Sequence, residues 1–134
     1  MRQVEIMKAL ADENRLRILN LLNRNLLCVC ELETILNLNQ SNISRHLAKL
    51  RNMGIIIAEK DAQWVHYKLD KEFKIKNPEL WSHAEKIFQR ISICIEDSER
   101  YESYLNNGFT CKDIQKDKEF VFKKINKAEF KIGL

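Results

Sequence analysis

The side chains of this chain that could bind a soft metal ion or react with an oxidant are four cysteines, Cys28, Cys30, Cys94 and Cys111. Cys28 and Cys30 are separated by one residue, and paired soft thiolates select soft ions such as trivalent arsenic or antimony, cadmium, lead or zinc. On a helix, residues two apart lie about 200° apart around the axis and do not face each other. One ion can therefore bind both thiols only where the backbone is unwound or extended, because residues i and i+2 then share a side.

A third thiol would complete a trigonal site for arsenite, and the sequence offers two candidates. We favour Cys111, which lies in a C-terminal tail that could reach the cysteine pair of either subunit in a dimer. Cys94 is the rival, but it lies in an apolar run, where a buried cysteine is typically a small hydrophobic residue. We expect As(III) or another thiophilic ion to act as an inducer, and we expect no metal to be required for folding.

The stretch 26–54, which contains the cysteine pair, predicts a helix-turn-helix. Residues at helical spacing give the first helix one apolar side, namely Val29, Leu32, Ile35 and Leu36. Short polar side chains at 37–39 favour a turn, and Asn39 can cap a second helix that runs from Gln40 to about Met53. Gly54 follows, where a residue with a left-handed backbone is favoured.

The second helix has a polar side of the kind that a helix needs in the major groove of DNA. Short polar side chains there can reach base edges, while Arg and Lys side chains can reach guanine or phosphate. The residues of this helix that we predict to contact DNA are Gln40, Ser41, Asn42, Ser44, Arg45 and Lys49.

After this helix the pattern changes to that of β-structure. The β-branched run at 55–58 and the alternating segment at 63–69 predict two strands joined by a hairpin turn at 59–62. A hairpin directly after a recognition helix is a wing, and its tip would carry Lys60 and Gln63 along the phosphates or into the minor groove. We expect His66, on the second strand, to pack or to face solvent rather than to bind metal.

Three further helices are predicted around this motif. A short helix at 4–10 and a helix capped by Asp12 precede it, and a long helix from Glu79 to about Asn106 follows it. Near 91–95 the apolar residues spread almost all round the long helix, which is typical of a helix sandwiched between its own domain and a second subunit. We therefore predict a homodimer whose interface uses the long helix together with the first one.

The expected fold is mainly α with a small β-hairpin wing: a winged helix-turn-helix of about five helices that dimerises through its terminal helices. Residues 1–107 would form this DNA-binding and dimerisation domain, and residues 108–134 a tail of uncertain structure, in which 120–122 and 130–132 could be short strands. No apolar run approaches the roughly 20 residues that span a bilayer, and no uninterrupted apolar signal segment opens the chain. We expect a cytoplasmic protein with no membrane partner, in which cysteines are typically reduced.

Three motifs, in the same order along the chain, resemble those of the ArsR/SmtB family of metal-responsive winged-helix repressors. They are ALADENRLRIL at 9–19, LCVCEL at 27–32 and NQSNISRHL at 39–47. The resemblance covers roughly residues 4–107 and implies a cysteine-containing metal box, a recognition helix, and a packing and hydrogen-bonding role for His46.

The chain also departs from the pattern of that family. Arsenical-sensing members often carry a third cysteine three residues after the second, and Glu33 occupies that position. Family wings usually carry Gly and Arg at the tip, where this chain has Ala62 and Gln63. The Asp/His pattern that zinc-sensing members carry on the last helix is missing, since His83 stands alone there.

The sequence thus predicts a dimeric repressor of double-stranded operator DNA with an inverted repeat. Arsenite, antimonite or a related ion would bind the Cys-x-Cys site, distort the helix that supports the recognition helix, and release the DNA. The alternatives are a thiol redox or persulfide-responsive repressor and a cadmium or lead sensor on the same scaffold. We do not expect an enzyme, because the sequence carries no nucleophile–base pair, Gly-rich phosphate loop or cofactor fingerprint.

Overall fold

A computed structural model describes the backbone of residues 2–132 and the side chains of residues 2–126; residues 1, 133 and 134 lie outside it. Four helices come first: α1 (Arg2–Leu10), α2 (Glu13–Leu22), α3 (Val29–Leu36) and α4 (Gln40–Asn52). One sheet contains the strands β1 (Leu27–Cys28), β2 (Ile56–Asp61) and β3 (Trp64–Leu69). The later helices are α5 (Lys71–Lys76), α6 (Pro78–Phe88), α7 (Ser92–Asn106), α8 (Cys111–Lys116) and α9 (Lys118–Ile132).

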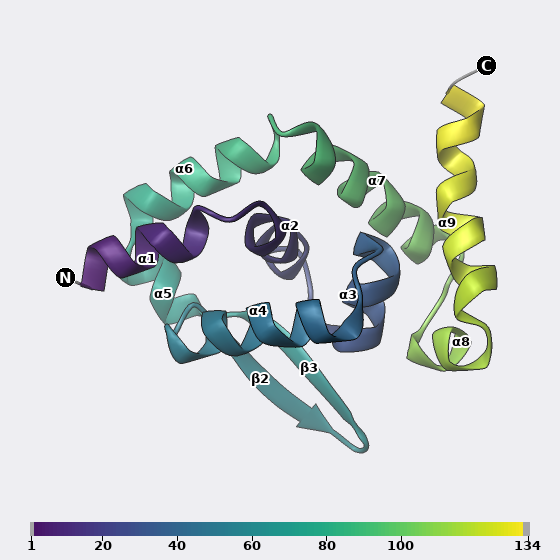
Figure 1. The fold of residues 1–134 in the computed structure, drawn as a ribbon, viewed down its shortest axis with the longest axis horizontal. Helices are drawn as coiled ribbons and strands as arrows, with labels where there is room; N and C mark the ends of the chain where they lie inside the picture. Colours follow the sequence, from purple (N-terminus) through teal and green to yellow (C-terminus); the bar gives the residue numbers. More distant parts are fainter. Residues whose placement is uncertain (1, 133–134) are drawn as a thin grey trace.

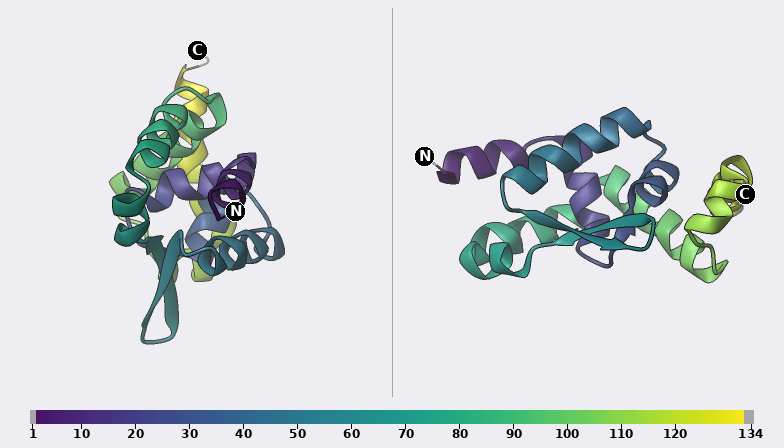
Figure 2. Two further views of the ribbon diagram at one scale, coloured as in Figure 1. Left: turned by 90° about the vertical axis from the view of Figure 1, so that its left-hand side faces the viewer. Right: turned by 90° about the horizontal axis from the view of Figure 1, so that it is seen from below.

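These elements form the predicted winged helix-turn-helix. Helices α3 and α4 follow each other across a short turn, α2 lies in the middle of the molecule, and α6 and α7 run along the opposite edge (Figure 1). The β2–β3 hairpin projects from the helical body as a wing (Figure 2). The helix-turn-helix packs on α2 through fully buried aliphatic side chains, among them Leu19, Leu32, Ile35, Ile43 and Leu47. Burying one such side chain contributes about 1.5–3 kcal/mol, so this core fixes α4 on the body.

The polar residues predicted to begin the helices do so. The Asp12 carboxylate accepts a hydrogen bond from the Arg15 backbone N–H at 3.0 Å. The Asn39 side chain accepts one from the Asn42 backbone N–H at 2.8 Å and so caps α4. Gly54 follows α4 with φ +75°, the left-handed conformation expected there.

The sheet differs from the predicted two-stranded hairpin, because it has a third strand. β1 pairs antiparallel with β3, so that Leu27 lies opposite Tyr67 and Cys28 lies opposite His66. A strand of two residues is too short to show an alternating pattern, which explains why the sequence did not reveal it. The predicted turn at 59–62 was also misplaced, since β2 continues to Asp61 and the turn falls at residues 62–63.

The long helix predicted for residues 79–106 is broken into α6 and α7. Trp81, Ala84 and Phe88 form the buried side of α6, but burial resumes at Cys94 rather than one turn after Phe88. Six residues at about 100° each turn the buried side by about 240°, which one straight helix cannot accommodate. The chain therefore leaves the helix at residues 89–91 and restarts in a new direction, as Figure 1 shows.

The tail is helical, and the strands predicted at 120–122 and 130–132 were wrong. Both segments belong to α9, which packs against α7 and α3 and adds the fully buried Val121 and Ile125 to the core. Together with the short α5 and the break before α7, the two tail helices raise the count to nine within residues 2–132, against about five predicted. Within the same residues, no helix is both long enough and apolar enough to cross a membrane.

Candidate metal centre and DNA-binding surface

Three cysteine sulfur atoms meet at one point beside the helix-turn-helix. The Sγ atom of Cys28 lies 2.9 Å from that of Cys30 and 2.6 Å from that of Cys111. All three thiols are free, and they form a group that could bind one metal ion. Within the described residues Cys94 belongs to no such group, because its fully buried side chain lies in the core formed by α7.

The backbone at the start of α3 explains how Cys28 and Cys30 share one side. Cys28 is the last residue of β1 and has extended backbone angles, with φ −90° and ψ 169°. The predicted first helix of the helix-turn-helix therefore contains Cys30 but not Cys28, because α3 starts only at Val29. The extended start places the two thiols together without unwinding any helical turn.

The tail supplies the third thiol. Cys111 is the first residue of α8, and Asp113 in the same helix accepts a hydrogen bond from the Thr110 backbone N–H at 2.7 Å. Lys118, at the start of α9, forms an ion pair with Glu33 of α3. These contacts and the packing of α9 on α3 hold Cys111 beside the cysteine pair of its own chain.

A small hollow connects the thiols to the surface near the recognition helix. It has a volume of about 270 Å³ and is lined by Cys28, Cys30, Glu33, Gln40 and Trp64, among others. An ion that enters through it therefore reaches the sulfur atoms within a short distance of the first residue of α4.

The environment keeps two of these thiols protonated. The hydrogen bond with Cys30, followed by burial, raises the pKa of Cys28 well above its ordinary value. Burial, followed by the contact with Cys28, raises the pKa of Cys111 in the same direction. At neutral pH both groups are thiols rather than thiolates, so they react slowly with oxidants.

Helix α3 is held by α7 at its start. The Glu31 carboxylate accepts a hydrogen bond from the Cys28 backbone N–H at 3.1 Å and one from the Tyr104 hydroxyl at 2.5 Å. Burial, followed by the hydrogen bond to Glu31, raises the pKa of Tyr104, so this hydroxyl remains a donor. The thiol site is thereby linked to α7 through one buried side-chain pair.

The far end of α3 is held by a buried charge network. Arg17 of α2 donates to the Leu36 carbonyl at 2.7 Å, and Arg100 of α7 donates to the Ile35 carbonyl at 2.9 Å. Asp97, which is fully buried, accepts from both guanidinium groups. The positive charges lie where the helix dipole is negative, so they fix the end of α3 just before the turn into α4.

The sequence analysis missed the members of these two networks. The sequence did carry a signal for the charge network at the end of α3, because Asp97 and Arg100 lie three residues apart on the buried side of α7. Charged residues at apolar positions are rarely buried unless they are paired, and they indicate a network of this kind. Tyr104 carries no comparable signal, because a buried tyrosine is common in any core.

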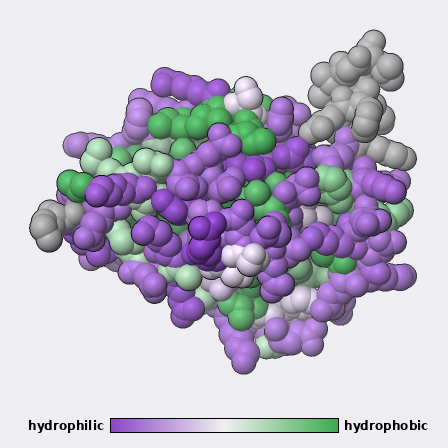
Figure 3. Space-filling model, viewed as in Figure 1, coloured by the Kyte–Doolittle hydropathy of each residue, from purple (hydrophilic) through white to green (hydrophobic). Residues whose placement is uncertain are grey.

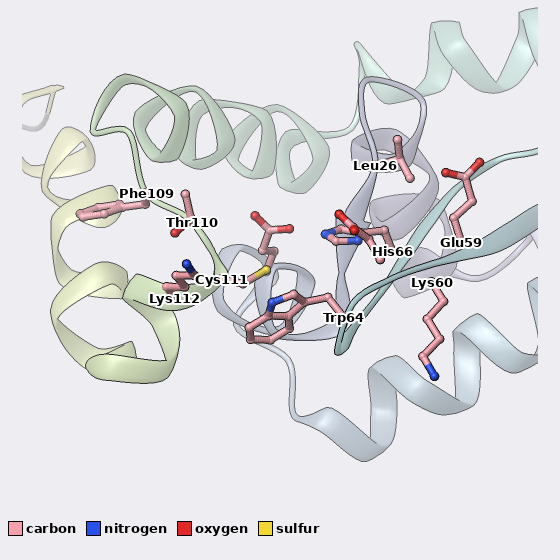
Figure 4. Close-up of a pocket in the computed structure, with 11 residues that line it drawn as sticks. Leu26, Glu59, Lys60, Trp64, His66, Phe109, Thr110, Cys111 and Lys112 are labelled. Carbon is pink, nitrogen blue, oxygen red and sulfur yellow. The ribbon is translucent and has the colours of Figure 1, made fainter.

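The side chains predicted to contact DNA lie on the surface. On α4 Gln40, Ser41, Ser44, Arg45 and Lys49 are exposed, Asn42 is half-buried, and on the wing Lys60 and Gln63 are exposed. The Asn42 amide oxygen accepts a hydrogen bond from Arg45 at 2.6 Å and so orients its guanidinium. Lys60 lies in β2 rather than in the turn, and it is one of the residues that line a hollow beside Cys111 (Figure 4).

His46 packs inside the domain, as the family resemblance implied. Its side chain is buried under α4, and its Nδ1 atom lies 3.3 Å from the Arg15 guanidinium. His66 lies on β3, half-buried, and within 4.8 Å of ligand atoms of Glu31 and Cys111.

Comparisons with known proteins agree with the fold. A sequence profile of the bacterial regulatory proteins of the arsR family matches residues 12–58. The arsenical resistance operon repressor of Escherichia coli (strain K12) is 38% identical over 105 residues, which cover 78% of this chain and 82% of that protein. The arsenic resistance transcriptional regulator ArsR2 of Pseudomonas putida (strain KT2440) is 42% identical over 86 residues, covering 63% and 69% respectively.

A solved structure is similar as well. Reduced HlyU from Vibrio cholerae N16961 has a TM-score of 0.56 to this chain at 38% sequence identity, and the match covers 68% of this chain and 90% of HlyU. The fold and these relatives define a winged helix-turn-helix regulator of transcription that binds DNA, and not an enzyme. The chain belongs to the arsR family of bacterial regulatory proteins.

Proposed function

We propose that this protein is a dimeric repressor that releases its operator when trivalent arsenic or antimony binds Cys28, Cys30 and Cys111. The observation that carries the proposal is the meeting of three sulfur atoms from β1, α3 and α8 at one point. Soft sulfur ligands select soft ions, and three of them complete a trigonal site. The similarity to an arsenical resistance operon repressor supports the same choice of ion.

The protonated thiols favour arsenite over a divalent cation at this site. Arsenite in neutral water is As(OH)₃, and its hydroxides can take up the three thiol protons and leave as three water molecules while three As–S bonds form. A divalent cation brings no such base and must expel the protons to solvent, which makes its affinity depend strongly on pH. Because the pKa values of Cys28 and Cys111 are raised, this difference favours the trivalent ion.

We infer that α3 carries the signal from the thiols to the DNA-binding surface. Sulfur atoms around an ion at about 2.3 Å lie roughly 4 Å apart, so binding must separate Cys28 from Cys111. That movement acts on the N-terminal end of α3, whose other end is fixed by Arg17 and Arg100 beside the turn into α4. DNA is released only if the ion binds the shifted state more tightly than the DNA-bound state.

On the DNA side, we propose that the exposed polar side chains of α4 read the major groove while the wing contacts the backbone. The contact residues are Gln40, Ser41, Asn42, Ser44, Arg45, Lys49, Lys60 and Gln63. A dimer of such domains would require an inverted repeat with half-sites about one helical turn apart.

The exposed apolar side chains support a dimer through the terminal helices of residues 1–107. Val4 and Met7 on α1 and Ile75 on α5 are more than half exposed, and a hydrogen bond from Gln3 to Asn77 joins the same parts of the chain. Hydrophobic residues also gather along the edge formed by α6 and the start of α7 (Figure 3). Exposed apolar patches of this kind mark subunit interfaces.

X-ray absorption at the arsenic edge tests the proposed ligand set. Arsenite bound to the wild-type chain should have three sulfur neighbours, and Cys111→Ser should leave two. Cys94→Ser is the matched control, because it removes a cysteine outside the cluster and should leave all three. Three sulfur neighbours in Cys111→Ser, or oxygen neighbours in the wild-type protein, would contradict the proposal.

A thiol redox switch is the second candidate, and the contact between Cys28 and Cys111 favours it. Two sulfur atoms this close could form a disulfide when an oxidant removes two electrons and both protons leave. The raised pKa values of both thiols oppose the reaction, since the thiolate is the reactive form. Mass spectrometry after peroxide treatment distinguishes the two functions, because the redox hypothesis requires a loss of two mass units within one chain.

A further inference from the structure

A second group of metal-binding side chains lies next to the three thiols. Glu31, His66 and Cys111 each offer one ligand atom, and these atoms lie within 4.8 Å of one another. They come from three separate elements, α3, β3 and α8. Figure 4 shows Cys111 and His66 facing the same hollow, with Trp64 beneath them.

The backbone and its hydrogen bonds hold these ligands in place. His66 lies on the central strand, directly opposite Cys28 in β1 and Glu59 in β2. The Glu31 carboxylate accepts from the Cys28 backbone N–H and from the Tyr104 hydroxyl, and a carboxylate can accept about four interactions, so it can still bind an ion. Hydrogen bonds of this kind orient metal-binding carboxylates.

The ligand types differ from those of the three-thiol site. One sulfur, one imidazole nitrogen and one carboxylate oxygen suit a divalent ion of intermediate softness such as Zn²⁺, which binds all three types in tetrahedral geometry. Three protein ligands leave the fourth position to water or another small ligand, and the hollow of about 720 Å³ provides room for it. Only one thiol has to lose its proton here, against three at the other site.

We propose that Glu31, His66 and Cys111 form a second metal site, which binds a divalent ion of the Zn²⁺ class. The site goes beyond the arsenite response proposed above, although it shares Cys111 with the three-thiol site. Because both centres draw on the Cys111 sulfur, the divalent ion and arsenite compete for it. The divalent ion would join the wing strand β3 to α3 and α8, whereas arsenite would join α8 to the β1–α3 junction alone.

Cobalt(II) is the probe for this site. Its visible absorption reports tetrahedral coordination, and a sulfur-to-cobalt charge-transfer band reports a thiolate ligand. The full chain carrying Cys30→Ser is the starting protein, because this change breaks the three-thiol site and leaves all three ligands of the second site. It should bind one Co²⁺ per chain with both spectral signals, and Zn²⁺ should displace the Co²⁺ and raise the melting temperature.

Adding His66→Ala to Cys30→Ser should weaken Co²⁺ binding at least about tenfold and abolish the Zn²⁺-dependent rise in melting temperature. His66→Gln should give the same result. His83→Ala is the matched control, because it removes an exposed histidine on α6, and it should change neither measurement. Co²⁺ binding that survives both His66 variants, or that falls equally with His83→Ala, would overturn the proposal.

Arsenite binding to the same variants tests the second site independently of the proposed function and shows whether the variants are folded. With Cys30 intact, His66→Ala should bind arsenite as the wild-type chain does, which also shows that the variant is folded. Arsenite should displace bound Co²⁺ from the wild-type chain, since both need Cys111. Failure of arsenite binding with the expected Co²⁺ results would remove the proposed function and leave the second site supported.

Discussion

The side chains that we propose to act in this protein are held by close partners, some of them on the same helix and others far apart in the sequence. Arg45 is one example, since its guanidinium is held by Asn42 on the exposed side of α4. A side chain held in this way loses less conformational entropy when it contacts a base, which strengthens a specific contact.

We predict that Arg45→Ala weakens operator binding by about 1–3 kcal/mol and reduces base preference, as expected for the loss of a guanine contact. Fluorescence anisotropy at fixed salt measures both effects. Arg51→Ala is the control, because it removes an exposed arginine near the other end of the same helix. Unchanged affinity of the Arg45 variant would remove this residue from the DNA-contacting set.

The buried His46 should make stability depend on pH. Burial, which outweighs the nearby Asp12 carboxylate, lowers the pKa of His46 below its ordinary value of 6.5. As pH falls through 6.5 the unfolded chain takes up this proton before the folded chain does, so the free energy of unfolding decreases until the lowered pKa is reached.

Urea unfolding above and below pH 6.5 tests this, and His46→Gln should reduce the difference between the two conditions. The exposed His83 supplies the control, because His83→Gln should keep the wild-type pH dependence. Equal pH dependence in wild type and His46→Gln would show that another group is responsible.

At the scale of elements, each helix of the DNA-binding motif depends on how its ends are fixed. We predict that Asn39→Ala destabilises the protein by about 0.5–2 kcal/mol, because the Asn42 N–H loses its acceptor at the start of α4. Asn39→Asp keeps an acceptor and should retain wild-type stability in the same thermal unfolding experiment. A loss of equal size in both variants would show that the cap is not the cause.

The end of α3 depends on a buried carboxylate. Asp97→Asn should cost about 3–5 kcal/mol of unfolding free energy, because it leaves the buried guanidinium of Arg17 without its opposite charge. Glu96→Gln makes the same change at the neighbouring exposed position and should stay within about 0.5 kcal/mol of wild type. A loss below about 1 kcal/mol for Asp97→Asn would mean that the network contributes little to holding α3.

The elements with strong periodic patterns and capping residues could be predicted from the sequence. Asp12, Asn39 and Gly54 lie where local chemistry alone favours a helix start or end. Helices α2 and α4 therefore begin where the sequence predicts them. The break between α6 and α7 has no proline or glycine to mark it, because it results from packing on α2. Likewise β1 exists only because β3 offers it a partner.

At the scale of the whole molecule, the cysteine pair could be identified from its spacing, but its third partner depended on tertiary structure. Cys111 lies 83 residues after Cys28 and reaches it because α9 packs on α3 and α7. The tail, residues 108–134, was expected to have an uncertain structure, and within the part described it contributes helices α8 and α9, with buried side chains, to the core. We propose that this part of the tail belongs to the sensor, because it carries Cys111 and holds it beside Cys28.

In the proposed mechanism, three thiols convert arsenite binding into loss of DNA binding. Fluorescence anisotropy of labelled operator DNA, with arsenite titrated under reducing conditions, tests it most directly. We predict that arsenite releases the DNA from the wild-type protein and from Cys94→Ser but not from Cys28→Ser. Release from Cys111→Ser should require at least about tenfold more arsenite. Operator binding that persists in wild type at saturating arsenite, or release that survives Cys28→Ser, would contradict it.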